Sequence, residues 1–78
     1  MSGKETSVSL TVGDKVAVKV SGSHGGFFIR YGTIVLYNDL TNKIKYQYTR
    51  IEFHHAGTVT TTQHPPITTW TSVKNIVS

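Results

Sequence analysis

The 78-residue chain contains no cysteine, so neither a disulfide nor a thiolate metal site stabilises its fold. Small secreted domains usually depend on disulfides, and we therefore expect a cytoplasmic protein. No apolar run approaches the roughly 18 residues of a membrane-spanning helix, and residues 1–6 lack the apolar stretch of a signal peptide. The sequence thus predicts a soluble protein with no membrane partner.

Helix-forming patterns are also scarce. Alanine occurs only at Ala17 and Ala56, and no apolar repeat with helical spacing extends over three turns. Threonine, valine, isoleucine and aromatic residues, which favour strands, dominate instead. We expect an all-β protein in which residues 1–7 form a flexible tail and residues 8–78 form one small domain.

Acidic residues are few: four stand against eight basic ones, which gives a net charge of +4 and an isoelectric point of about 9.6. This balance favours polyanionic partners, nucleic acid above all. The four carboxylates form no obvious acid–base pair, and the chain has neither a serine nucleophile elbow nor a phosphate-binding glycine loop. We therefore expect no catalytic residues and no enzymatic activity.

Alternation of apolar and polar residues predicts a sheet of about five strongly bent antiparallel strands. The expected strands are residues 15–20, 28–37, 43–53, 58–62 and 67–71. The glycine-rich segment Ser21–Gly26 and the segment Asn38–Asn42 read as a loop and a turn. A short 3₁₀ turn at Ser72–Lys74 is expected before a last strand that closes the sheet.

In the third expected strand, residues 43–53, the apolar residues change from even-numbered to odd-numbered positions, a change of parity. Ile44, Tyr46 and Tyr48 share one face, and both tyrosines are therefore expected in the core. The apolar positions then move to the other parity at Ile51. Such a shift predicts a bulge or sharp bend near Thr49–Arg50.

Basic residues occupy the outward positions of the predicted strands. Lys15 and Lys19 share one face of the first strand, and Lys43 and Lys45 share one face of the third. Cations arranged in this way bind phosphates. With two arginines added, the predicted nucleic-acid-binding set is Lys15, Lys19, Arg30, Lys43, Lys45 and Arg50.

Aromatic side chains are interleaved with these cations, and bases stack on exposed rings. Phe27 and Phe28 are neighbours in a strand and so point to opposite faces, which leaves one of them exposed unless a partner covers it. The predicted partner contacts are Phe27, Phe28, Tyr31 and Trp70.

Four histidines, His24, His54, His55 and His64, lie in or beside expected loops. Several imidazoles can bind zinc or copper, but adjacent histidines in a strand seldom bind one ion, and no obvious carboxylate completes a ligand set. We interpret them as surface residues and expect no metal and no cofactor.

The threonine-rich segment Thr58–Thr62 is predicted to be an edge strand that His64–Pro66 ends, because proline donates no hydrogen bond to a ladder. Such an edge can accept a partner strand. The alternative, which we favour, is an ordinary solvated edge.

The segment Gly13–Val18, followed by Tyr31–Val35, resembles the "Gly-Asp-x-Val-x-Val" strand and the later "Gly-x-Val" strand of SH3-like barrels of the KOW and Tudor type. The resemblance covers about the first half of the domain. It implies a small barrel that contacts RNA, ribosomal or polymerase surfaces through the loop Ser21–Phe27 and the basic strand faces. The chain departs from that family in the extended Thr-, His- and Pro-rich hairpin, residues 54–66.

Size and opening motif also resemble the type II dihydrofolate reductases, small SH3-like barrels that act as tetramers. The Val-Gln-Ile-Tyr active-site strand of that family has no counterpart here; Ile67–Trp70 is a poor substitute. The favoured function is a non-catalytic module that binds nucleic acid or a nucleoprotein complex. The alternatives are a protein-interaction or self-assembling module, of the kind that phages and other mobile elements encode, and a metal-dependent or folate-type enzyme.

Overall fold

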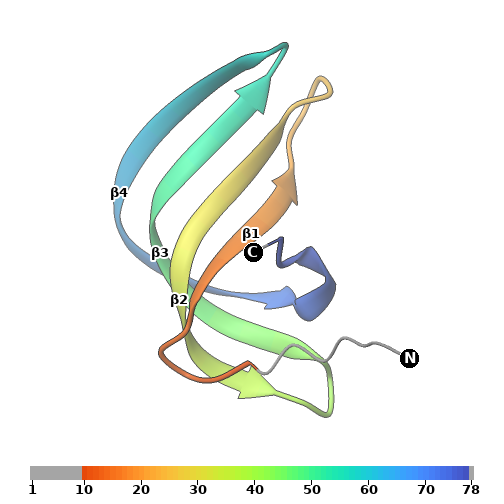
Figure 1. The fold of residues 1–78 in the computed structure, drawn as a ribbon, viewed down its shortest axis with the longest axis vertical. Helices are drawn as coiled ribbons and strands as arrows, with labels where there is room; N and C mark the ends of the chain where they lie inside the picture. The colour runs from red at the N-terminus through yellow and green to blue at the C-terminus, as the bar shows by residue number, and fades with distance from the viewer. Residues whose placement is uncertain (1–9, 78) are drawn as a thin grey trace, which may run out of the picture.

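The protein folds as one antiparallel sheet. The computed structural model describes residues 10–77, so the expected tail, residues 1–7, lies outside the described part of the chain. The strands are β1 (Lys15–Ser21), β2 (Phe27–Asn38), β3 (Lys43–His55) and β4 (Thr58–Ser72), and a 3₁₀ turn, η1 (Val73–Asn75), follows. Each strand pairs with its neighbour in sequence, in the order β1-β2-β3-β4 (Figure 1). The expected all-β class and the 3₁₀ turn are confirmed.

The expected number of strands needs a correction, since residues 10–77 form four strands in a sheet that does not close. Residues 58–62 and 67–71, expected as two strands, are the two halves of β4. The expected last strand is reduced to one bridge between Ile76 and Val18, beside which the Val77 amide donates to the Ala17 carbonyl oxygen at 2.8 Å.

The prediction that His64–Pro66 ends a strand is also wrong, and the register shows why the prolines are tolerated. Tyr48 pairs with Ile67 and Arg50 pairs with Gln63, so three residues of β4 stand opposite Thr49 alone. The ladder is thus interrupted where the prolines lie. Because β4 is also an edge strand, their missing N–H groups cost no sheet hydrogen bond.

The bulge expected near Thr49–Arg50 is confirmed. On the β2 side Tyr31 pairs with Arg50 and Gly32 with Tyr48, which leaves Thr49 without a partner there too. A Cβ atom on Gly32 would collide with the carbonyl oxygen of Gln47, so the backbones of β2 and β3 approach closely at this point. Bulges of this kind bend a sheet, and the strands curve around the C-terminal segment (Figure 1).

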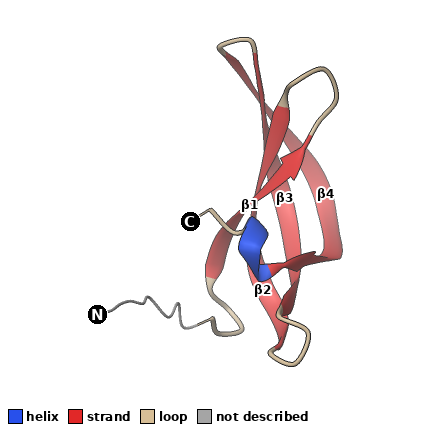
Figure 2. Ribbon diagram, turned by 90° about the vertical axis from the view of Figure 1, so that its right-hand side faces the viewer, coloured by secondary structure: helices blue, strands red, loops and turns tan. Residues whose placement is uncertain are grey.

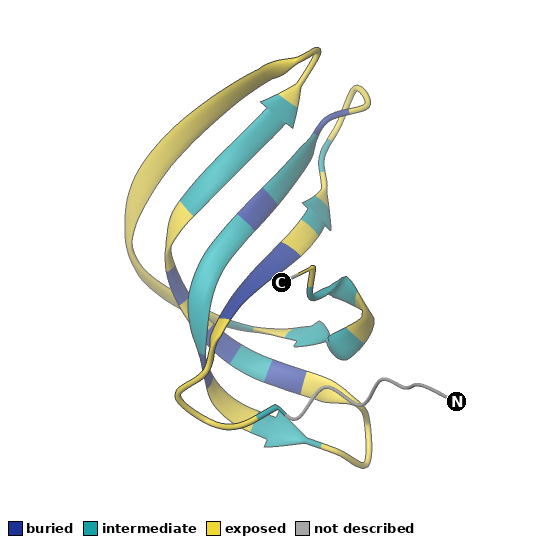
Figure 3. Ribbon diagram, viewed as in Figure 1, coloured by how far each residue is buried: buried dark blue, intermediate teal, exposed yellow. Residues whose placement is uncertain are grey.

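The hydrophobic core lies on the face inside this curve. Val18, Ile34, Ile44 and Tyr46 are fully buried there, and Tyr48 is 5% exposed, as expected for both tyrosines. The C-terminal segment covers these residues through Val73 and Ile76, which are among the partly buried residues packed against the core. Figure 2 shows η1 on one side of the curved sheet, and Figure 3 shows the buried positions in β1, β2 and β3.

The connections follow the expected turn chemistry. The side-chain oxygen of Asn38 accepts hydrogen bonds from the amides of Leu40 and Thr41, and Asn42 ends the turn with a φ of 58°. In the glycine-rich loop, His24 and Gly25 both have positive φ values. No helix among residues 10–77 is long and apolar enough to cross a membrane.

Candidate functional site

The sheet face opposite the core, called the outer face below, carries most of the cations. Strand alternation places Lys15 and Lys19 of β1 there, because Val16, Val18 and Val20, which alternate with Lys15, Ala17 and Lys19, face the core. Residues that pair across strands share a face. Lys19 of β1 pairs with Ile29 of β2, and Ile29 pairs with Glu52 of β3, so Lys19 and Glu52 lie on the same face. The cations of the outer face are Lys15, Lys19, Lys43, Lys45 and Arg50.

Arg30 does not join them, contrary to the expectation from sequence. It pairs with Val18 and Ile51 and so lies on the core face. Its Nη1 donates to the Tyr46 hydroxyl at 3.2 Å, and its guanidinium lies 4.8 Å from the centre of the Tyr48 ring. Its buried Nε finds no hydrogen-bond partner among the described residues. The half-buried Arg30 is therefore part of the packing beneath the sheet.

Arg50 takes the opposite position. Its guanidinium lies 4.0 Å from the centre of the Tyr31 ring on the outer face. The Tyr31 hydroxyl donates to Glu52 Oε1 at 2.8 Å, and the same oxygen is 3.2 Å from Nε2 of His54. Arg50, Tyr31, Glu52 and His54 thus form one connected chain of contacts across β2 and β3.

These contacts shift two pKa values in opposite directions. The hydrogen bond from Tyr31, followed by that from His54 and the charge of Arg50, holds the pKa of Glu52 below its ordinary value of 4.5. The hydrogen bond to Glu52, with partial burial, raises the pKa of Tyr31 above 10.0. Near neutral pH the network therefore holds an ionised carboxylate and a neutral phenol. Glu52 is the one carboxylate among the described strand residues, and the network engages it.

The two adjacent phenylalanines lie on opposite faces, as expected. Phe27 stacks on His54 on the outer face with ring centres 4.8 Å apart, and Lys19 Nζ lies 4.6 Å from the Phe27 ring. Phe28 packs against Phe53 on the other face, with ring centres 4.7 Å apart. Cross-strand aromatic neighbours thus leave both phenylalanines half-buried without any second chain.

Trp70 extends the outer face to β4. It pairs with Lys45, which in turn pairs with Leu36 of β2, so a lysine stands between two apolar side chains. Trp70 is 46% exposed and Leu36 is 47% exposed. The outer face therefore offers exposed aromatic and aliphatic surface directly beside cations.

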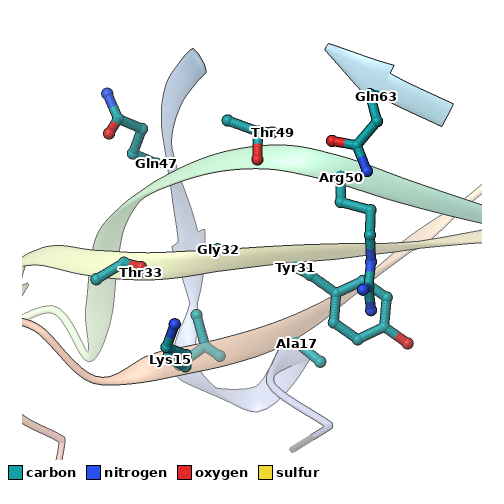
Figure 4. A pocket seen from close by; sticks show the side chains of 10 residues that line it. Lys15, Ala17, Tyr31, Gly32, Thr33, Gln47, Thr49, Arg50 and Gln63 are labelled. Atoms are coloured by element: carbon teal, nitrogen blue, oxygen red, sulfur yellow. The ribbon is translucent and has the colours of Figure 1, made fainter. Parts of the chain in front are cut away.

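A hollow of about 530 Å³ lies on the outer face where the sheet bends (Figure 4). Two rows of cross-strand neighbours flank it. The Tyr31 row consists of Ala17, Tyr31, Arg50 and Gln63, and the Thr33 row consists of Lys15, Thr33 and Gln47. Between the rows stand Gly32, which has no side chain, and the bulged Thr49.

Gln47 and Gln63 belong to this site and are absent from the set expected on sequence. The parity of β3 already put Gln47 outward with Lys45. The position of Gln63 beside Arg50 could not be predicted from the sequence, because it depends on the three unpaired residues His64–Pro66, which set the register of β4 against β3.

The histidines do not gather into a ligand set. His54 contacts Glu52 and Phe27, whereas Nε2 of His55 lies 3.1 Å from the backbone oxygen of His24. His64 lies apart in the β4 irregularity. Within residues 10–77 no group of three or more histidine, cysteine, aspartate or glutamate side chains is placed to hold a metal ion.

Comparison of the chain with protein-family models, with curated proteins and with solved structures finds no significant match.

Proposed function

We propose that this protein is a non-catalytic module that binds nucleic acid through its outer face. The observation that carries the proposal is the segregation of charge: five of the eight basic residues share one sheet face, where Glu52, the one carboxylate in the strands of residues 10–77, is engaged by its neighbours. A phosphate chain laid across the sheet meets lysines on β1 and, beyond β2, the lysines and the arginine on β3. Half-buried and exposed rings beside them supply surfaces on which bases stack.

The fold of such a module, in this proposal, is an open variant of the SH3-like barrels of the KOW and Tudor type. Its support is the curved sheet with a bulge at its bend and the C-terminal segment that bridges β1 after a 3₁₀ turn. The Gly13–Asp14 turn that leads into β1 fits the same arrangement, because both the Gly13 amide and the Asp14 carbonyl pair with Ile34 of β2.

The test is the salt dependence of binding to a labelled oligonucleotide, followed by fluorescence anisotropy. If all five cations engage phosphates, affinity for a single strand falls about 100-fold between roughly 50 and 200 mM salt. An affinity that does not change over this range contradicts the proposal. The core-face Arg30 and the η1 residue Lys74 serve as positions whose neutralisation leaves the salt slope unchanged.

A second candidate function, self-association, is favoured by one observation on β4. Within the described part of the chain this strand pairs only with β3, and its first eleven residues, Thr58–Thr68, are all exposed. Of these, Thr58–Gln63 carry no charge and no proline, so the residues that usually protect an edge are missing. Edge-to-edge pairing of two copies predicts a concentration-dependent dimer, which light scattering detects directly.

A further inference from the structure

The hollow at the bend lies between two rows of outward-facing side chains. These rows are separated by about 7 Å along β1 and β2, two residues of extended chain. The residues between the rows on these strands, Val16 and Gly32, pair with each other and belong to the core face, so neither places a side chain between the rows. We propose that the hollow holds one unpaired base, so that the ligand of the outer face is single-stranded nucleic acid. This inference rests on the proposed function and specifies its ligand.

One wall of the hollow is a prepared stacking surface. Arg50 lies 4.0 Å above the Tyr31 ring, and the hydrogen bond from Tyr31 to Glu52 holds that ring in place. Bases stack on aromatic rings and on guanidinium planes alike. The protein's own contacts already hold these two side chains in place. A base that stacks on them therefore costs little additional side-chain entropy.

The rim of the hollow supplies the polar groups that a base and its phosphate require. Gln63 stands in the Tyr31 row and Gln47 in the Thr33 row (Figure 4). Each amide has one acceptor and two donors, and within residues 10–77 no side-chain hydrogen bond engages either of them. Lys15, exposed at the β1 side of the same hollow, is placed for a phosphate.

The stacking surface favours an unpaired base over a base pair as the occupant of the hollow. A volume of about 530 Å³ is within the range of small-ligand sites, and it lies between two rows of a single sheet face. In a duplex the bases are stacked and paired, and their flat faces are not available to a protein ring. Single strands present those faces, so the hollow distinguishes them from duplexes.

The experiment compares labelled oligonucleotides of about 10 nucleotides, within the site size of small β-sheet binders, as single strands and as annealed duplexes. DNA and RNA are both tested against the wild type, Tyr31→Leu, Tyr31→Phe, Gln47→Ala, Gln63→Ala and the control Thr61→Ala. Thr61 lies on the outer face of β4, one position beyond the hollow. Circular dichroism of each variant verifies the fold.

We expect single strands to bind at least about tenfold more tightly than duplexes. Tyr31→Leu should weaken single-strand binding by about 5- to 100-fold, the effect of losing one stacked base, whereas Tyr31→Phe, which keeps the ring and loses its hydrogen bond to Glu52, should weaken it less. Gln63→Ala should weaken single-strand binding and leave duplex binding unchanged, and Thr61→Ala should alter neither. A preference for RNA or for DNA supports the inference equally and identifies the source of the strand.

Equal affinity for single strands and duplexes, or wild-type affinity in both Gln63→Ala and Gln47→Ala, overturns the base site. Salt-dependent binding that persists in that case leaves the proposed function standing. If neither form of nucleic acid binds, both the base site and the proposed function are wrong.

Discussion

Arg50 and Tyr31 form a stacked pair on the outer face, with the guanidinium 4.0 Å from the ring centre, and Arg30 and Tyr48 form a looser counterpart on the core face at 4.8 Å. The same two residue types thus meet on both sides of one sheet. On the outer face the arginine is exposed, and on the core face it is half-buried. Substituting each arginine in turn therefore tests which face of the sheet binds the ligand.

Neutralising Arg50 should therefore weaken nucleic-acid binding, and neutralising Arg30 should not. Loss of one phosphate contact lowers the salt slope by about one and the affinity by about 5-fold at roughly 0.1 M salt. Anisotropy titrations of Arg50→Met and Arg30→Met measure both quantities. Lys74→Gln is a second control, because Lys74 lies on η1 away from the outer face. Equal losses in the Arg50 and Arg30 variants would place the binding surface elsewhere.

The sequence was sufficient for the strand faces but not for the position of every residue on them. Period-2 alternation correctly separated Lys15 and Lys19 from Val16 and Val18, because β1 is regular throughout. The prediction put Arg30 on the outer face because β2 has polar and apolar residues at both alternating sets of positions, so its alternation does not tell the two faces apart. On the core face the Tyr46 hydroxyl accepts a hydrogen bond from Arg30. Strand alternation alone cannot reveal a partner so distant in sequence.

The bend was predictable and the course of β4 was not. The parity shift at Ile51 reported the Thr49 bulge directly, since a bulge exchanges the faces of all later residues. The prolines of β4 indicated a strand end, which is the usual consequence of proline in a ladder. Here the bulged Thr49 makes room for three unpaired residues opposite it, and the strand resumes at Ile67.

Gly32→Ala tests the close approach of β2 and β3 at this bend. The new Cβ atom would collide with the Gln47 carbonyl oxygen, which is backbone and cannot rotate away. We expect the free energy of unfolding to fall by about 2–3 kcal/mol, the upper part of the range for overpacking. Urea denaturation followed by tryptophan fluorescence measures it. Thr33→Ala, one residue away, should cost less than about 1 kcal/mol; a similar loss in both variants would contradict the steric explanation.

Glu52→Gln tests the carboxylate of the outer-face network. The pKa of Glu52 is lower in the folded chain, because Tyr31, His54 and Arg50 all favour its ionised form. Its charge therefore stabilises the fold above its ordinary pKa of 4.5, and this contribution is lost as the pH falls through the lower, folded value. Glutamine keeps an acceptor for the Tyr31 hydroxyl, so the variant isolates the charge.

We expect wild type to be more stable than Glu52→Gln at about pH 7, and the difference to shrink as the pH falls below 4.5 and through the lower pKa of the folded chain. Urea unfolding over a series of pH values from neutral to acid provides the comparison. The same variant should bind nucleic acid more tightly at neutral pH, because it removes a negative charge from the outer face. A stability difference that does not change with pH would show that the ionisation of Glu52 does not matter to the fold.

Thr60→Lys tests whether the free edge of β4 joins two copies of the chain. Thr60 pairs with Phe53 and so lies on the face opposite the proposed nucleic-acid surface. A lysine on an edge strand opposes pairing with a second edge, because two like charges would meet across a two-fold interface. If wild type dimerises through this edge, light scattering should show the dimer shifted to monomer in Thr60→Lys.

Thr41→Lys, in the exposed turn between β2 and β3, adds the same charge away from the edge and should leave the dimer intact. A dimer that survives Thr60→Lys excludes the β4 edge, and a wild type that stays monomeric at millimolar concentration excludes self-association altogether.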